Sequence, residues 1–250
     1  MAPSRRIIGF INIAHFFDHY SMLIFPAALI VMSPAFGLSF GEFLPYATPG
    51  FIAFGAGSLV SGWLGDRWSR RAMMLVYYFG IGLSLIACGM AQTPLQAGAG
   101  LFLVGTFASI YHPVGGAMLA AHAEKLGKTL GLNGIFGNFG VAFSALVTGV
   151  LCEYLGWRYA FIVPGALVAL VGLAFLVTVS DTTSPKPKAA RKTTGMGSIP
   201  GISIRRIFVV LLLTAIGSSV AFNAITVALP RRYLMGTAPQ TRESADPSLL

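Results

Sequence analysis

Ionisable side chains lie inside an apolar stretch near the N-terminus, where they are expensive to place. Asp18 lies near the middle of this stretch, and a carboxylate at the centre of a membrane helix costs about 2.5–3.5 kcal/mol on insertion scales. At 100° per helical residue, His15, Asp18 and His19 share an arc of about 100°, and Asn12 continues it one turn earlier. This stretch therefore has one polar face, which must lie against a cavity or another helix.

A second polar site lies in a later apolar stretch, at Tyr111-His112-Pro113. Proline lacks a backbone N–H, so we expect the helix to loosen around it. Imidazole and carboxylate groups at membrane depth indicate a functional centre, although histidines that are simply hydrogen-bonded to neighbouring helices are the plainer alternative. His15, Asp18, His19 and His112 are also suitable metal ligands by type. Their spacing does not orient them for ligation, and the sequence predicts neither a metal site nor a cofactor.

The composition indicates which solvent the chain meets. Hydrophobic residues make up 55% and charged residues 10%, whereas soluble domains carry about a quarter charged residues. The net charge of +9 comes from short basic clusters between apolar runs, which is not the pattern of a nucleic-acid-binding surface. Cys88 and Cys152 lack CxxC spacing, which disfavours a disulfide framework or a zinc site. No P-loop, nucleophile elbow or zinc-protease motif is present, so we expect no enzyme.

Seven apolar segments are long enough to cross a bilayer, which takes about 20 residues per helix. Lipid offers no partners for backbone polar groups, so each segment is expected to be helical. The predicted fold is an all-α membrane protein with a six-helix bundle at 1–180, a cytoplasmic linker at 181–205, a seventh transmembrane helix at 206–229 and a polar tail at 230–250. The first six spans are predicted near 7–31, 43–64, 72–91, 97–120, 130–152 and 157–179.

The basic residues predict the orientation, since cytoplasmic loops carry the excess of Lys and Arg. Most of the 17 Lys and Arg fall on the side of the N-terminus, in the loops after the even-numbered spans. We therefore expect a multi-pass protein of the bacterial inner membrane with a cytoplasmic N-terminus. A seven-helix receptor is disfavoured, because its N-terminus lies outside the cell.

The most specific motif joins the second and third predicted spans. It resembles the signature loop of the major facilitator superfamily, a family of membrane transporters, with Ser69 where the family has glycine. In the family, the acidic position that corresponds to Asp66 helps to lock the two halves of the transporter together. Small residues every four positions along the second span, from Ala53 to Gly65, predict close helix contact. The matching signature positions are Gly62, Gly65, Asp66, Arg67, Arg70 and Arg71.

The resemblance implies the N-terminal six-helix bundle of the major facilitator fold. Because the first and fourth spans of this fold line a central cavity, Asp18 and His112 are expected to face each other. Asn12, Tyr111 and Asn223 in the seventh span are further candidates to line the cavity. The polar first span together with the His-Pro of the fourth resembles the fosmidomycin-resistance type of drug exporter.

These features predict a secondary transporter that exports small organic compounds in exchange for protons. Asp18 is the expected proton-titrating group, with His112 and His15 or His19 as its partners. The expected partners of the chain are the lipid bilayer, a small-molecule substrate and protons. A complete transporter of this superfamily has two six-helix bundles. The alternatives are therefore a truncated, non-transporting remnant, a half-transporter that pairs with a second bundle or with another copy of itself, or an excerpt of a longer protein.

Overall fold

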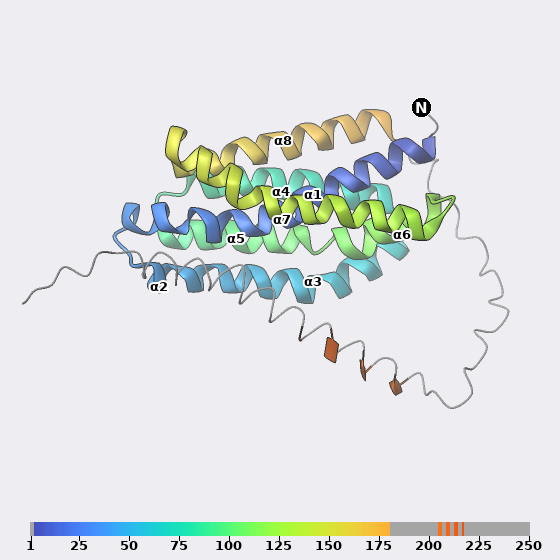
Figure 1. Ribbon diagram of the computed structural model, residues 1–250, viewed down its shortest axis with the longest axis horizontal. Helices are drawn as coiled ribbons and strands as arrows, with labels where there is room; N and C mark the ends of the chain where they lie inside the picture. The colour runs from blue at the N-terminus through green and yellow to red at the C-terminus, as the bar shows by residue number, and fades with distance from the viewer. Residues whose placement is uncertain (1–2, 181–204, 207–208, 211–212, 215–216, 218–250) are drawn as a thin grey trace, which may run out of the picture. The chain divides into compact units, whose positions relative to one another are not determined.

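The computed structural model describes residues 3–180 and isolated positions between 205 and 217 (Figure 1). The chain divides into two compact units, Met1–Lys186 and Pro187–Leu250, and all of the helices named below belong to the first. Asn223, the polar tail and most of the predicted linker and seventh span lie outside the described residues.

Six helical segments of the described residues are long and apolar enough to cross a membrane, and they match the six predicted spans. Two of them are composite, because a 3₁₀ helix, η1, interrupts the second and a π-helix, η2, the fourth. No strand occurs in the described residues. The elements are α1 (Pro3–Ala35), α2 (Phe40–Phe43), η1 (Leu44–Ala47), α3 (Thr48–Arg67), α4 (Arg70–Met90), α5 (Pro94–Ala108), η2 (Tyr111–Gly115), α6 (Gly116–His122), α7 (Leu126–Leu155) and α8 (Trp157–Thr178).

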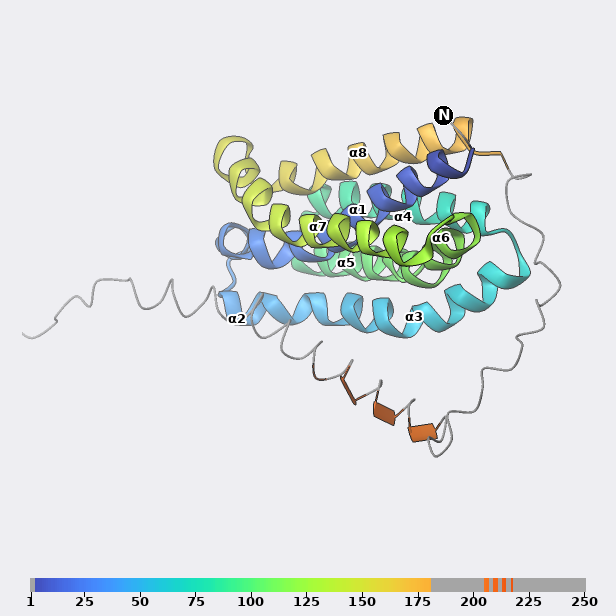
Figure 2. The same ribbon diagram turned by 45° about the vertical axis from the view of Figure 1, so that its right-hand side comes forward.

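The long helices run roughly along one common direction and pack in pairs, with α1 against α7, α4 against α8 and α3 against α5 (Figures 1 and 2). Glycines allow the closest of these contacts. A Cβ atom at Gly165 in α8 would lie 2.7 Å from the Gly82 carbonyl oxygen in α4. Because neither backbone can turn aside, these two helices can meet so closely only where both residues lack a side chain.

The predicted row of small residues on α3 makes its contact with the fourth span. A Cβ at Gly65 would lie 2.9 Å from a Val114 methyl group, and the Ser61 hydroxyl lies 3.1 Å from the Ser109 hydroxyl. Gly57 also faces Ser109. The spacing of four residues along the second span is thus confirmed as a packing surface.

The signature loop between α3 and α4 is tied to the end of α8. Arg71 donates through Nη2 to the Leu176 carbonyl at 2.8 Å and through Nε to the Val179 carbonyl. Asp66 and Arg70 form an exposed ion pair of 3.2 Å. This loop therefore satisfies carbonyl groups that a helix C-terminus leaves without backbone partners.

Ser69 has a local role that explains why glycine is dispensable there. Its Oγ accepts a hydrogen bond of 3.2 Å from the Ala72 amide and so caps the N-terminus of α4. Its φ of −128° and ψ of 124° are extended values open to any residue. The departure from the family signature replaces backbone freedom with a helix cap.

Candidate functional site

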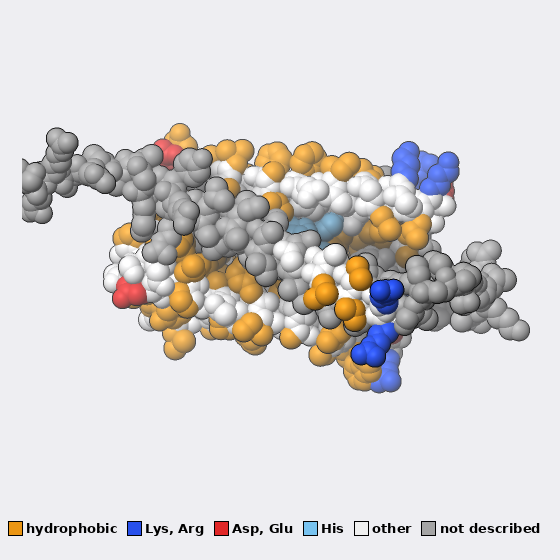
Figure 3. Space-filling view, turned by 60° about the horizontal axis from the view of Figure 1, so that its bottom comes forward, with side chains coloured by type: hydrophobic (Ala, Val, Ile, Leu, Met, Phe, Trp, Pro, Cys, Tyr) orange, Lys and Arg blue, Asp and Glu red, His pale blue; other side chains and the backbone are white. Residues whose placement is uncertain are grey.

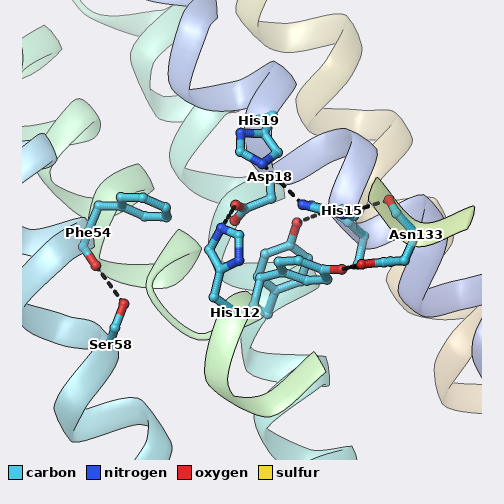
Figure 4. A network of polar contacts seen from close by, with 10 residues as sticks. His15, Asp18, His19, Phe54, Ser58, His112 and Asn133 are labelled. Atoms are coloured by element: carbon cyan, nitrogen blue, oxygen red, sulfur yellow. Dashed lines mark hydrogen bonds and ion pairs between the residues drawn. The ribbon is translucent and has the colours of Figure 1, made fainter. Parts of the chain in front are cut away.

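The polar face of α1 meets the π-helix η2 and the start of α7 inside the bundle (Figure 4). Asp18 is 0% exposed and Asn12 is also buried, whereas His15 and His19 are partly buried. The His112 side chain is 45% exposed. The structure thus brings together the polar residues that the sequence predicted in two distant spans.

Asp18 and His112 face each other, as expected. His112 Nε2 lies 3.4 Å from Asp18 Oδ2, and the contact is an ion pair if the imidazole is protonated. Neither carboxylate oxygen accepts a hydrogen bond among the described residues. A buried carboxylate without hydrogen-bond donors is expensive, so its chemistry depends on the charge that His112 or a bound ion brings to it.

His15 occupies the centre of the site. Its Nδ1 lies 2.8 Å from the Asn133 carbonyl oxygen, and its Nε2 lies 3.1 Å from His19 Nε2. Because a carbonyl oxygen only accepts, Nδ1 must carry a proton, which leaves Nε2 of the neutral ring with its lone pair. The ring stacks on Tyr111 with centroids 4.8 Å apart.

Asn133 in α7 joins the network and was missed by sequence reasoning. Its Nδ2 donates to Asn12 Oδ1 at 3.0 Å and lies 2.9 Å from the Tyr111 hydroxyl. The signal was a buried amide among the glycines that begin the fifth span. Tyr77 was missed as well, and its hydroxyl donates to the Ala14 carbonyl at 2.7 Å, bracing α1 behind the histidines.

A π-helix carries His112 into the site. The sequence predicted a loosened helix around Pro113, and the residues from Tyr111 to Gly115 form a single π turn between α5 and α6. Such turns are rare and recur at functional sites. This turn places Tyr111 against His15 and His112 against Asp18.

Glycines of α7 leave space for the site. A Cβ at Gly137 would lie 2.6 Å from two atoms of the His15 ring. Gly140, one turn further, faces the backbone of Phe16, whereas Gly131 and Gly134 face open space. Of these four glycines at the start of the fifth span, only Gly137 and Gly140 therefore serve the contact with α1.

Three imidazoles come close enough to share one ligand. One ring nitrogen from each of His15, His19 and His112 lies within 4.8 Å of the others. Together with Asp18, these groups are able to exchange protons or to bind a cation. Of the predicted cavity-lining residues, Asn12 and Tyr111 belong to this network, and Asn223 lies outside the described residues.

Comparison with known proteins decides the family. The profile of the Major Facilitator Superfamily matches residues 11–241. The chain belongs to this superfamily. A solved structure supports the fold, since a bacterial homologue of the human lysosomal transporter Spinster aligns with a TM-score of 0.56 at 16% identity, covering 72% of this chain and 44% of that one.

Several curated proteins are similar to part of this chain. The puromycin resistance protein pur8 of Streptomyces alboniger is 34% identical over 130 residues, which is 50% of this chain and 26% of that protein. The multidrug resistance protein MdtG of Escherichia fergusonii is 30% identical over 132 residues, 51% of this chain and 31% of that protein. The gallate transporter of Pseudomonas putida is 23% identical over 153 residues, 60% of this chain and 34% of that protein. The chain thus spans about a third or less of the length of these relatives.

Proposed function

We propose that this superfamily member acts as a secondary transporter that exports small organic compounds, with the Asp18–His112 pair as the place where protons couple to transport. The observation that carries the proposal is a carboxylate with no exposed surface in contact with a half-exposed imidazole, 3.4 Å away. Membrane proteins pay the cost of such groups at depth chiefly where they move ions or substrates.

The geometry supports a coupling step at this pair. A proton that moves from a protonated His112 to Asp18 converts an ion pair into two neutral groups, and the reverse transfer restores both charges. Asp18 belongs to α1 and His112 to η2, so each protonation state favours a different packing of these two elements. A ligand or proton that prefers one packing shifts the protein toward it, which is the requirement for coupled transport.

The substrate class rests on the relatives. Two of them are named for resistance, to puromycin and to multiple drugs. The polar first span with the His-Pro of the fourth resembles the fosmidomycin-resistance type, and this subtype stands as part of the proposal. Puromycin and fosmidomycin are therefore suitable first probes.

A second bundle is expected to complete the transport path. The exposed side of His112 leaves one side of the site open, and transporters of this fold enclose their site between two bundles. A second copy of the chain or another polypeptide is a candidate to close it. Lys and Arg gather toward one end of the described bundle (Figure 3), and by the positive-inside rule this end and the N-terminus are cytoplasmic.

The test is puromycin accumulation in everted membrane vesicles that contain the chain, driven by an imposed proton gradient. We expect Asp18→Asn to abolish gradient-driven accumulation, because the amide does not exchange protons. Glu153→Gln is the matched control, since Glu153 is an exposed carboxylate near the end of α7, and it should accumulate puromycin like wild type. Equal accumulation by wild type and Asp18→Asn, with fosmidomycin giving the same result, contradicts the proposed role of Asp18.

A further inference from the structure

We propose that His15, His19 and His112 bind a divalent transition-metal ion of the Zn²⁺ type, with Asp18 balancing its charge. His15 and His19 are four residues apart on α1, so they lie on one face of the helix, the spacing that helical zinc sites use. His112 approaches from η2, across the space between two spans (Figure 4). Ligands from two elements are able to enclose an ion that neither element holds alone.

The distances fit the ion. Zinc binds imidazole nitrogen at about 2.0–2.1 Å in tetrahedral geometry, which places two ligand nitrogens about 3.3 Å apart. His15 Nε2 and His19 Nε2 are 3.1 Å apart, and all three imidazoles offer a nitrogen within 4.8 Å of the others. The half-exposed His112 side chain would have to rotate to close the larger separation. A fourth position is left for water.

Outer contacts prepare two of the ligands. Histidine ligands usually donate their second ring N–H to a carbonyl or carboxylate, which fixes the ring and exposes the lone pair of the other nitrogen. His15 does so through Nδ1, which faces the Asn133 carbonyl at 2.8 Å. His112 turns Nε2 toward Asp18, which leaves Nδ1 to bind the ion. The close contact between the Nε2 atoms of His15 and His19 is the position that an ion would bridge.

The charge balance also favours a cation. Asp18 is completely buried, and neither of its carboxylate oxygens accepts a hydrogen bond among the described residues. A divalent ion beside His112 would place positive charge near this carboxylate and lower the cost of burying it. The site thus has a buried carboxylate beside one of the three imidazoles, and no described residue donates a hydrogen bond to it.

The ligand type selects the class of metal. Imidazole suits zinc, copper, iron and nickel, whereas Mg²⁺ and Ca²⁺ prefer sets of oxygen ligands. His112 is 45% exposed, and imidazole surface is visible midway along the bundle (Figure 3), which gives an ion a path of entry. This binding goes beyond the proposed function and is measured without transport, so either proposal can fail while the other stands.

The experiment is isothermal titration of ZnCl₂ into the full chain, purified in detergent through a tag free of histidine. We expect one Zn²⁺ per chain, no heat of binding from MgCl₂, and binding at least tenfold weaker in His19→Ala and in His112→Ala. His122→Ala is the matched control, because His122 lies at the end of α6, is not one of the three clustered imidazoles, and its Nδ1 lies 2.8 Å from the Met118 carbonyl oxygen. It should bind Zn²⁺ like wild type.

Folding of the variants is checked independently. Bound Zn²⁺ should raise the thermal unfolding temperature of wild type and of His122→Ala, since a ligand that binds only the native state stabilises it. Titration of wild type with Co²⁺ should give the visible absorption of a tetrahedral nitrogen-ligated ion even if a variant fails to fold. Absence of stoichiometric Zn²⁺ binding by wild type, binding that folded His19→Ala retains, or an octahedral Co²⁺ spectrum overturns the proposal.

Discussion

The contacts α4–α8 and α1–α7 use glycine in the same way and carry different groups. Between α4 and α8, Gly82 and Gly165 bring two backbones together, and carbon atoms of Leu85, Ile86 and Ala169 surround them. Between α1 and α7, Gly140 allows the same approach to the backbone of Phe16. One turn away in the α1–α7 contact, however, the space beside Gly137 holds the imidazole of His15.

The difference indicates that the α4–α8 contact holds the bundle together, whereas the α1–α7 contact carries the candidate site. Space beside Gly82 is filled by backbone, so that contact tolerates no change of shape. Space beside Gly137 is filled by the His15 side chain, which is able to rotate. His15 in turn contacts Asn133 and His19. We expect the α4–α8 contact to be rigid and the α1–α7 contact to respond to protons or ions.

The largest effect is expected from Gly165→Ala, which places a Cβ 2.7 Å from the Gly82 carbonyl oxygen. Because backbone must move, we expect the free energy of unfolding to fall by about 3 kcal/mol, the upper part of the range for overpacking. A thiol-reactive dye measures unfolding, since Cys88 and Cys152 are free and buried. Gly149→Ala, at a glycine facing open space, should be neutral or stabilising. Equal losses in both variants would show that the α4–α8 contact is not rigid.

The second largest effect is expected from Asn133→Ala, which tests whether the α1–α7 contact also depends on its buried hydrogen bonds. The change leaves Asn12 Oδ1 and the Tyr111 hydroxyl without a buried partner. We expect a loss of about 2 kcal/mol in the free energy of unfolding, because unsatisfied buried groups cost about 1–3 kcal/mol each. The exposed Asn138 of the same helix provides the control, and Asn138→Ala should leave thermal unfolding unchanged.

The third prediction concerns Gly137→Ala, which should weaken Zn²⁺ binding while changing the stability of the bundle only slightly. The new methyl would lie 2.6 Å from the His15 ring, which is able to rotate away, so we expect less than about 1 kcal/mol of lost stability. Turning the ring should weaken Zn²⁺ binding about tenfold, as changes that disorient a ligand do. Calorimetry of Gly134→Ala, one turn earlier and facing open space, should match wild type. A stability loss as large as that of Gly165→Ala would remove the contrast between the two pairs.

The smallest effect is expected from Ser69→Gly, which restores the glycine of the family signature. Glycine replaces a serine cap at a cost of a few tenths of a kcal/mol, so we expect the unfolding free energy to fall by about 0.3 kcal/mol. Ser69→Ala should cost about 1 kcal/mol, because alanine is a poorer cap than glycine. The reverse order in thermal unfolding would show that Ser69 acts through something other than its cap on Ala72.

Much of the bundle was predictable because each span carries its own signal. Length and apolar composition gave the six spans of the described residues to within several residues at each end. The row of small residues ending at Gly65 predicted a real contact, since four-residue spacing is a property of one helix.

The site was predictable only in part, because it depends on contacts between spans. The polar face of α1 could be derived from helical periodicity, but its meeting with His112 needed the family resemblance. The contact between His15 and Asn133 could not be derived from residue types, because it uses the backbone carbonyl of Asn133, a group that every residue carries. Which glycines of α7 face α1 depends on how that helix is rotated, and spacing does not fix this rotation.

The π turn at Tyr111–Gly115 has a consequence for how this span can change over evolution. A π turn holds one residue more than the α-helical turn it replaces, so it amounts to a single-residue insertion absorbed within the helix. Deleting one residue there would restore an uninterrupted α-helix and turn one end by about 100° relative to the other. Such a deletion would retain the packing of only one end, either that of α5 against α3 or that of α6 against α1. The insertion lets one continuous span follow two helical registers, one on each side of the turn.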